Sequence, residues 1–284
     1  MNLEQRLIET QASLYNLLPE SIRPFANRVR VVPTYLRWRI RAEGYRHSKR
    51  VLEEFRNRYR GSRCVIIGNG PSLNQMDLDV LRAEYTFGLN RIYLLFPKWG
   101  FQTTFLVAIN RFVIKQYRKE IHAQNLVKIL NWRHRESFPP DEKTVYVCSS
   151  PGREMDGDIL TGYFTGGGTV TNVALEMAYY LGFEEVILIG IDHTYSAKGE
   201  PGMPMRSTQA DKDHFDPTYF GPGAVWQLPN YMTMEEGYWR AKHLFESNGR
   251  QVVDGTFNGN LQIFPKVDFY AYLAESKFKN QHNF

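Results

Sequence analysis

The chain carries a series of short, almost wholly apolar runs spaced along its length. They are RCVIIG (63–68), YTFGL (85–89), TTFLVAI (103–109), TVYVC (144–148), EEVILIG (184–190) and RQVVD (250–254). Continuous apolar runs of this length are typical of strands buried on both faces, as in a parallel sheet covered by helices. Amphipathic helical patterns lie between them, most clearly at 171–183 and 233–250. The alternation predicts an α/β fold with a doubly wound, mostly parallel, Rossmann-like sheet.

Two segments depart from this alternation. Residues 1–60 show helical patterns without strand signals, and they predict a basic helical extension in front of a Rossmann-like domain at 61–284. Residues 196–230 have no periodicity and are rich in Gly, Pro, Asp and Tyr. A loop this long inside a compact domain is usually functional, so it predicts a lid-like region over a site.

The positive charge of the chain is concentrated in residues 23–60, where only three glutamates oppose a run of arginines and lysines. Interleaved aromatic residues make this segment amphipathic, so it could lie on an anionic membrane surface or an acidic partner. The alternative is a solvated helical extension whose aromatic side chains pack on the main domain. No nucleic acid recognition motif accompanies the charge, and we expect no nucleic acid partner.

Composition narrows the class of protein. With 43% apolar and 23% charged residues the chain is globular. Cys64 and Cys148 each lie inside an apolar run, which favours buried thiols in a reducing compartment, and no paired-cysteine spacing indicates zinc. No apolar run approaches the roughly 20 residues of a membrane span, and the N-terminus lacks a signal-peptide pattern. We expect a cytoplasmic protein, or one peripheral at the inner face of the membrane.

Polar residues follow the ends of the first three predicted strands. The first strand runs into Gly68-Asn69-Gly70-Pro71-Ser72, where glycines would let the backbone turn and approach a phosphate. Asn90 and Asn110 end the next two strands, and an amide offers both a donor and an acceptor to a base, ribose or phosphate. Each feature alone could be an ordinary turn. Their repetition at successive strand ends favours a nucleotide site.

Two further loops complete this pattern. Thr169 and Thr171 open the helix at 171–183 after a glycine run, and hydroxyls with free N–H groups at a helix N-terminus favour an anion, although simple capping is equally compatible. Gly190 and Asp192 end the strand at 184–190. The carboxylate is expected to contact a ribose hydroxyl, because no second acidic residue forms a D-x-D metal clamp.

Together, GNGPSL, the strand ending in Asn before Arg-Ile-Tyr, the Thr/Gly-rich helix start and LGFEEVILIGID resemble the bacterial CMP-sialic acid-dependent sialyltransferases of glycosyltransferase family 42. They also resemble the related motility accessory factors and the 6-hydroxymethylpterin diphosphokinase-like domain. The resemblance covers roughly residues 63–268 and implies a GT-A-like variant of the sheet. It places nucleotide contacts at Gly68, Asn69, Gly70, Ser72, Asn90, Asn110, Thr169, Thr171, Gly190 and Asp192.

The resemblance also implies a reaction, the transfer of a sialic acid-like sugar from a CMP donor to a glycan acceptor hydroxyl with inversion. His214 matches the family's general base, with His193 as the rival base. The family holds the leaving phosphate with two tyrosines. Here Tyr195 stands one position late and Tyr219 could serve from the lid, so leaving-group stabilisation departs from the pattern. No cofactor is required by this scheme.

Two other functions stay open at this point. Pyrophosphoryl transfer from ATP, as in the pterin branch, would need Mg²⁺ and several carboxylates. These could come from Asp192, Asp211, Asp213 and Asp216. A non-catalytic nucleotide-sugar-binding module is the third reading.

Overall fold

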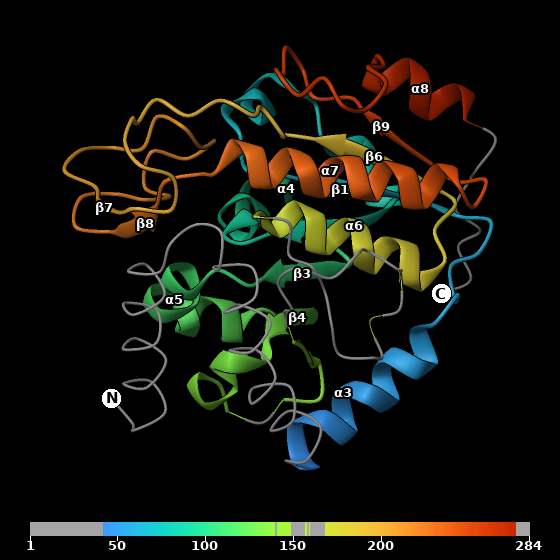
Figure 1. The fold of residues 1–284 in the computed structure, drawn as a ribbon, viewed down its shortest axis with the longest axis horizontal. Helices are drawn as coiled ribbons and strands as arrows, with labels where there is room; N and C mark the ends of the chain where they lie inside the picture. Colours follow the sequence, from blue (N-terminus) through green and yellow to red (C-terminus); the bar gives the residue numbers. More distant parts are fainter. Residues whose placement is uncertain (1–41, 140, 149–156, 158, 160–167, 277–284) are drawn as a thin grey trace, which may run out of the picture.

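The computed structural model describes residues 42–139, 141–148, 157, 159 and 168–276. Its centre is a seven-stranded parallel sheet with strand order β5-β4-β3-β2-β1-β6-β9 (Figure 1). The strands are β1 (Arg63–Ile67), β2 (Tyr85–Leu89), β3 (Phe105–Ala108), β4 (Val127–Asn131), β5 (Thr144–Val147), β6 (Glu185–Ile189) and β9 (Gln251–Asp254). The predicted doubly wound α/β fold is confirmed.

The strand order reverses beside β1. From β1 the chain adds β2 to β5 on one side, then returns to place β6 and β9 on the other. Ile67 at the end of β1 lies opposite Ile189 at the end of β6, so the loops that follow these two strands start side by side. In open α/β sheets, ligands bind outside the carboxyl ends of the strands at such a switch point.

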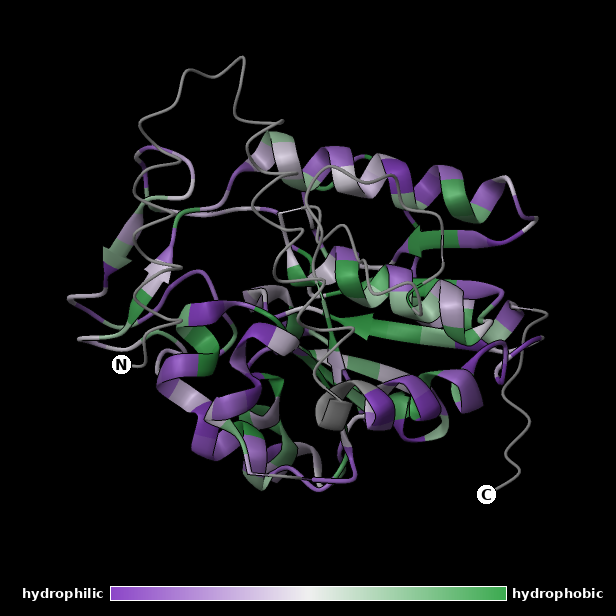
Figure 2. Cartoon of the chain, turned by 60° about the horizontal axis from the view of Figure 1, so that its bottom comes forward, coloured by the Kyte–Doolittle hydropathy of each residue, from purple (hydrophilic) through white to green (hydrophobic). Residues whose placement is uncertain are grey.

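Helices cover both faces of the sheet. They are α3 (Ala42–Phe55), α4 (Phe96–Trp99), α5 (Arg111–Ala123), α6 (Val170–Leu181), α7 (Tyr231–Glu246) and α8 (Phe269–Glu275). Within β1, Cys64 and Ile66 join the apolar core beneath α3, α6 and α7, whereas Val65 and Ile67 join the core beneath α4, α5 and α8. Figure 2 shows strands coloured as apolar between helices of mixed polar and apolar residues. Burial on both faces explains why these strands are continuously apolar.

Three strands were not predicted. The strand β4 contains Lys128, whose side chain is 1% exposed and forms an ion pair with Asp141 (Nζ–Oδ2 2.6 Å). A lysine breaks the apolar run that identifies the other strands. The lid region also contains a small antiparallel pair, β7 (Pro204–Arg206) and β8 (Val225–Gln227), where the sequence indicated only loop.

The predicted helical extension lies largely outside the described residues, as does half of the basic segment at 23–60. Its described part contains α3, which packs on the sheet through Leu52. Phe55 meets Phe105 edge-on, and Tyr59 stacks on Phe183. These aromatic side chains therefore pack on the main domain, which was one of the two alternatives expected from the sequence. Cys64 and Cys148 are buried, free thiols. Within the described part of the chain, no helix has the length and apolarity that a bilayer crossing demands.

Candidate functional site

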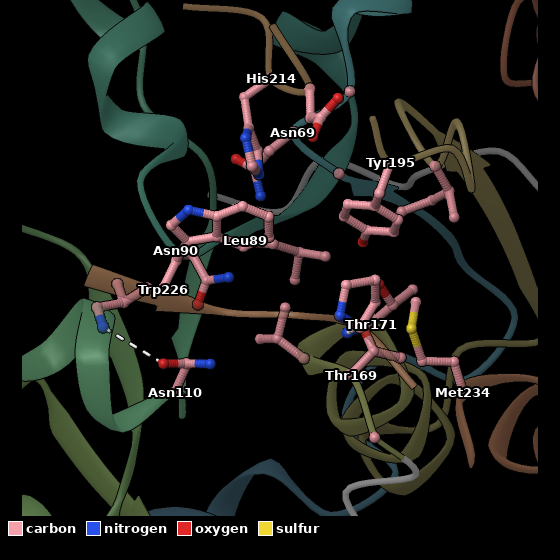
Figure 3. A pocket seen from close by; sticks show the side chains of 18 of the residues that line it. Asn69, Leu89, Asn90, Asn110, Thr169, Thr171, Tyr195, His214, Trp226 and Met234 are labelled. Atoms are coloured by element: carbon pink, nitrogen blue, oxygen red, sulfur yellow. Dashed lines mark hydrogen bonds between the residues drawn. The ribbon is translucent and has the colours of Figure 1, made fainter. Parts of the chain in front are cut away.

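A cavity of about 400 Å³ lies at the carboxyl edge of the sheet, between the switch-point loops, the start of α6 and the lid (Figure 3). It brings together every predicted site residue except Ser72. These are Gly68, Asn69, Gly70, Asn90, Asn110, Thr169, Thr171, Gly190, Asp192, Tyr195, His214 and Tyr219. The predicted spatial convergence is therefore present, while the role of each residue towards a ligand stays a prediction.

The glycines after β1 allow two loops to pack together. The N–H groups of Gly68 and Gly70 donate to the carbonyls of Ile189 (2.8 Å) and Gly190 (2.9 Å). A Cβ at Gly68 would lie 2.2 Å from the Gly190 carbonyl oxygen, and one at Gly70 would lie 2.0 Å from Asp192 Oδ1. These two N–H groups are thus used within the protein and are not left to contact a phosphate.

Ser72, the one predicted site residue that does not line the cavity, holds Asp192 in place. Its two carboxylate oxygens accept hydrogen bonds from the Ser72 hydroxyl (2.5 Å) and the Ser72 backbone N–H (3.0 Å). Ser72 therefore orients Asp192 from behind, where the sequence predicted a direct nucleotide contact. Each carboxylate oxygen can accept a second bond, which leaves Asp192 able to meet a hydroxyl in the cavity.

The three predicted asparagines have different surroundings. Asn110 caps α5, because its Oδ1 accepts from the N–H groups of Phe112 (2.8 Å) and Val113 (3.4 Å). The Oδ1 atoms of Asn69 and Asn90 are buried and have no hydrogen-bond partner among the described residues. Asn90 also has a left-handed backbone (φ 49°). Unsatisfied buried amides cost about 1–3 kcal/mol each and are typical of sites that await a ligand or water.

Thr169 forms the N-cap of α6, with its hydroxyl accepting from the Thr171 N–H (3.3 Å). The capping interpretation is correct, and it does not exclude ligand binding, because both residues also line the cavity. Figure 3 shows the pair on the side of the cavity opposite His214 and Asn69.

His214 is held by a carboxylate. Its Nδ1 lies 2.8 Å from Asp211 Oδ2, and its ring stacks on Tyr219 with centroids 3.9 Å apart. Because a carboxylate only accepts hydrogen bonds, this contact places the proton on Nδ1 and leaves Nε2 as the free base. Both the tautomer and the ring orientation of His214 are thereby fixed.

The charge of Asp211 is secured by its own hydrogen bonds. Burial raises the pKa of the Asp211 carboxyl, but the bond from His214 and bonds from the backbone of Asp213 (2.9 Å) and Phe220 (3.0 Å) outweigh it, and the net pKa lies below its usual value. Asp211 is therefore ionised near neutrality and stabilises an imidazolium at His214.

Two tyrosines complete this part of the cavity. Burial raises the pKa of both Tyr195 and Tyr219 well above the usual range, so each keeps its proton and can donate a hydrogen bond. The Tyr219 hydroxyl, however, lies 3.4 Å from the Arg91 backbone nitrogen, and the ring supports His214. Tyr195 is the better placed of the two to donate to a ligand.

The rival base, His193, is also bound to a carboxylate. Its Nε2 lies 2.9 Å from Glu235 Oε1, and the side chain is 5% exposed. Its other nitrogen, Nδ1, is buried and has no hydrogen-bond partner among the described residues. Because His193 also lines the cavity, substitution of each histidine decides between the two bases.

The lid is tied to the sheet on both sides of His214. The Phe215 N–H donates to the Asn69 carbonyl (2.9 Å), and Asn74 donates to the Phe215 carbonyl (2.8 Å). The Arg91 guanidinium stacks on Tyr117 (3.6 Å) and donates to the carbonyls of Thr218 (3.0 Å) and Tyr219. These bonds hold the lid against the loops at the carboxyl edge of the sheet.

Sequence reasoning missed several residues of the site. Asp211 was considered only as a metal ligand. Its position three residues before His214 could have indicated a carboxylate that contacts the histidine. Asn131 extends the series of strand-end asparagines to β4, and Arg133 follows it into the cavity wall. Both were overlooked because β4 itself was. Nothing in the sequence near Arg91 indicates its contact with the lid.

The four aspartates proposed for Mg²⁺ are not gathered into a metal site. Asp192 is bound to Ser72 and Asp211 to His214. Asp213 accepts from Ser196 (2.9 Å) and Asp216 from Thr218 (2.7 Å). Across the described residues, no group of three or more His, Cys, Asp or Glu side chains is arranged to hold a metal ion. Of the four aspartates, Asp192 and Asp213 line the cavity.

Comparison with known proteins gives one family and one solved structure. The structure of the MAf glycosyltransferase from Magnetospirillum magneticum AMB-1 is similar over 78% of this chain and 38% of that chain, at 14% identity and a TM-score of 0.46. The present chain thus spans well under half of that protein. No curated protein matched the sequence. The family model described as 6-hydroxymethylpterin diphosphokinase MptE-like matches residues 43–198, more than half of the 284 residues. The chain belongs to this MptE-like family.

Proposed function

We propose that the protein is a glycosyltransferase that moves an acidic, sialic acid-like sugar from a CMP-activated donor to an acceptor hydroxyl with inversion. The observation that carries this proposal is the placement of Asn69, Asn90, Asp192 and His214 around one cavity, with His214 held in the basic tautomer by Asp211. The sequence resemblance to the CMP-dependent sialyltransferases supplies the nucleotide and the sugar class.

The reaction requires a base and a stabilised leaving group. In the proposed step, His214 Nε2 removes the proton of the acceptor hydroxyl as its oxygen forms a bond to the anomeric carbon. The bond from that carbon to the phosphate oxygen breaks, and its electron pair leaves with CMP. An oxocarbenium-like transition state is expected, as in glycoside hydrolysis. A positioned base contributes roughly 10²–10⁴-fold to such a step.

The electrostatic roles follow from the same geometry. Asp211 stays negative and stabilises the imidazolium that forms on His214. Tyr195 stays protonated and can donate to the departing phosphate, together with the side-chain amides at the strand ends. Asp192, held by Ser72, is left to accept a ribose hydroxyl.

Substitution of the base tests the proposal. We expect His214→Ala to lower CMP release from a CMP-sugar by about 10²-fold or more while leaving CMP affinity within about threefold. His243→Ala removes an exposed histidine of α7 and serves as the matched control. Unchanged turnover in His214→Ala would remove the proposed base, and loss in His193→Ala alone would transfer the role to His193.

The family description favours a second candidate, pyrophosphoryl transfer from ATP to a pterin-like alcohol. Of the four aspartates expected to hold Mg²⁺, only Asp192 and Asp213 line the cavity. Thermal shift with CMP, and separately with ATP plus Mg²⁺, distinguishes the two, because only a nucleotide that binds the folded state raises the melting temperature. Stabilisation by ATP plus Mg²⁺ and none by CMP would refute the glycosyltransferase proposal. Binding of CMP without turnover of any CMP-sugar would indicate a non-catalytic module.

A further inference from the structure

A second cavity, of about 210 Å³, lies within the lid beside the first one. Four residues line both cavities, so the two adjoin: Asp213, His214, Phe220 and Trp226. Among the described residues, none of the predicted nucleotide contacts lines the second cavity. A transferase needs room for two substrates, and the proposed donor leaves this space unused.

The proposed base borders both spaces. His214 lines the two cavities, and its side chain is 15% exposed. Its Nδ1 is bound to Asp211, which lines only the second cavity. Because the two nitrogens of an imidazole point in different directions, Nε2 lies on the ring edge away from Asp211. A hydroxyl that passes the shared wall would therefore reach Nε2, while the rest of its molecule stays in the second cavity.

Aromatic rings form a row along the shared wall. Phe220 meets the His214 ring edge-on, with centroids 5.3 Å apart, and lies nearly parallel to the Trp226 indole (6.1 Å, 13°). Trp226 belongs to β8 and is half-buried. The face of an indole is electron-rich, so it attracts the weakly positive C–H groups on the apolar face of a sugar ring. The row thus offers a stacking surface that begins at the base.

Uncharged polar groups lie around this surface. The side chains of Ser207, Thr208 and Gln209 line the second cavity and form no hydrogen bond with another described residue. The indole N–H of Trp226 likewise has no hydrogen-bond partner within the described part of the chain. Hydroxyl and amide groups both donate and accept, which matches the hydroxyl groups of a sugar.

The formal charges of the second cavity cancel. Its lining carries two cations, Arg206 and Lys212, and two carboxylates, Asp211 and Asp213. Asp211 is bound to His214, and Asp213 accepts from the Ser196 hydroxyl (3.1 Å). A lining with balanced charge favours neither an anionic nor a cationic ligand. Together with the aromatic row, it fits an uncharged sugar.

A peptide fits this cavity less well, because the strand edges of the lid are not open. The side-chain amide of Gln116 binds both the N–H (2.8 Å) and the carbonyl (2.6 Å) of Val225 in β8. Strand β7 begins with Pro204, which has no N–H to donate. An extended peptide added to either edge would lack some of the main-chain hydrogen bonds on which that mode of recognition depends.

We infer that the second cavity is the acceptor site, and that it binds a neutral glycan whose sugar ring stacks on Trp226 and places a hydroxyl at His214 Nε2. The inference rests on the proposed function, which it deepens by placing the acceptor and naming its chemistry. The single observation behind it is that one histidine and one aromatic row line both cavities.

The test measures acceptor binding directly, by saturation-transfer NMR on protein saturated with CMP. The probes are methyl β-galactoside, methyl β-glucoside, methyl β-N-acetylglucosaminide, methyl α-mannoside and methyl β-glucuronide, with a short peptide rich in serine and threonine as the competing class. We expect at least one neutral glycoside to bind saturably through its apolar face. The glucuronide should bind no more tightly than the glucoside, a comparison that needs no variant.

Substitutions then locate the bound glycoside. Trp226→Leu should weaken it by about 10-fold because the stacking face is lost, and Trp226→Phe, which keeps a ring, should recover part of the affinity. Thr208→Trp puts a bulky ring into the wall of the second cavity alone. It should prevent glycoside binding and leave CMP affinity within about twofold, since separate sites act independently. Met203→Trp is the matched control: it adds the same ring at a position that is 46% exposed and lines neither cavity, and it should bind like wild type.

The outcomes separate this inference from the proposed function. Absence of CMP binding would refute the proposed function, and the acceptor role with it. Binding of CMP without any glycoside would overturn the inference alone. The inference is equally overturned if the peptide binds and Thr208→Trp displaces it, if the glucuronide binds more tightly than the glucoside, or if Thr208→Trp leaves glycoside binding unchanged.

Discussion

Replacement of Asp211 by asparagine tests the proposed base through its partner. Asp211 Oδ2 accepts from His214 Nδ1 and the Phe220 N–H, while Oδ1 accepts from the Asp213 N–H. All three contacts are donors, so an asparagine cannot satisfy them all. Its amide oxygen best replaces Oδ2, where it keeps two bonds, and its NH₂ group then faces the Asp213 N–H. The bond to His214 survives, but without the negative charge.

The expected cost is that of losing a charge beside the imidazolium. A charge-assisted hydrogen bond contributes about 1.5–3 kcal/mol, compared with about 1 kcal/mol for a neutral one. The difference, roughly 0.5–2 kcal/mol, bears on the transition state, because the imidazolium exists only once the proton has moved. At 1.36 kcal/mol per tenfold, Asp211→Asn should slow transfer by about 2- to 30-fold, and further if the lid loosens.

The measurement is single-turnover release of CMP at saturating donor, with CMP affinity determined alongside. Asp216→Asn is the matched control, because Asp216 accepts from Thr218 in the same lid and has no hydrogen bond to His214. We expect the control to stay within about twofold of wild type in rate. A wild-type rate in Asp211→Asn would refute the charge argument, as would a fall in CMP affinity that accounts for the whole loss.

Two further substitutions probe the loops and the electrostatics. Gly70→Ala should abolish CMP binding, because its Cβ would lie 2.0 Å from Asp192 Oδ1. Gly221→Ala should bind CMP normally, because the nearest atom to its Cβ, the Thr218 carbonyl oxygen, lies at an ordinary contact distance of 3.7 Å. Equal CMP affinities of the two variants, measured by thermal shift, would contradict this. The pKa of His134, about 4 against a usual 6.5, means that the unfolded chain binds the extra proton first as pH falls. Stability should therefore decrease from pH 6.5 to pH 4, by at most about 3 kcal/mol from this residue. His134→Gln should flatten that decrease in melting temperature, and an unchanged pH profile would rule His134 out as its source.

The sheet was predictable where burial alone sets the residue type. Val65 in β1 and Ile187 in β6 belong to central strands covered on both faces, and such strands are apolar throughout. β4 failed this rule because Lys128 enters the core with its charge neutralised by Asp141. That ion pair joins residues thirteen positions apart, and no local pattern indicates it. The strand pair in the lid was equally hidden, since three-residue strands carry too little periodicity to detect.

The site was predictable to the extent that topology dictates it. Parallel strands place their carboxyl ends on one edge, so polar residues after β1, β2, β3 and β6 had to converge. Two interpretations changed because their partners are distant in sequence. Ser72 faces Asp192 across 120 positions, and the glycines after β1 meet the loop after β6. The order of strands and loops in the sequence identifies which loops lie together at the sheet edge. Only the folded structure shows which of their polar groups already form hydrogen bonds within the protein.

The contacts of the lid fix the position of His214 relative to Asn69, in the loop after β1. Phe215, the residue after His214, donates its N–H to the carbonyl of Asn69. Its side chain is buried, 5% exposed, in the apolar core on one face of the sheet. Burial of a phenylalanine side chain is worth about 1.5–3 kcal/mol, so this anchor resists local opening. The base therefore cannot move away from Asn69 without exposing Phe215 and breaking the bonds of Arg91 to Thr218 and Tyr219. A ligand held by Asn69 thus lies at a fixed position relative to His214, and this is the preorganisation that a proton-transfer step needs.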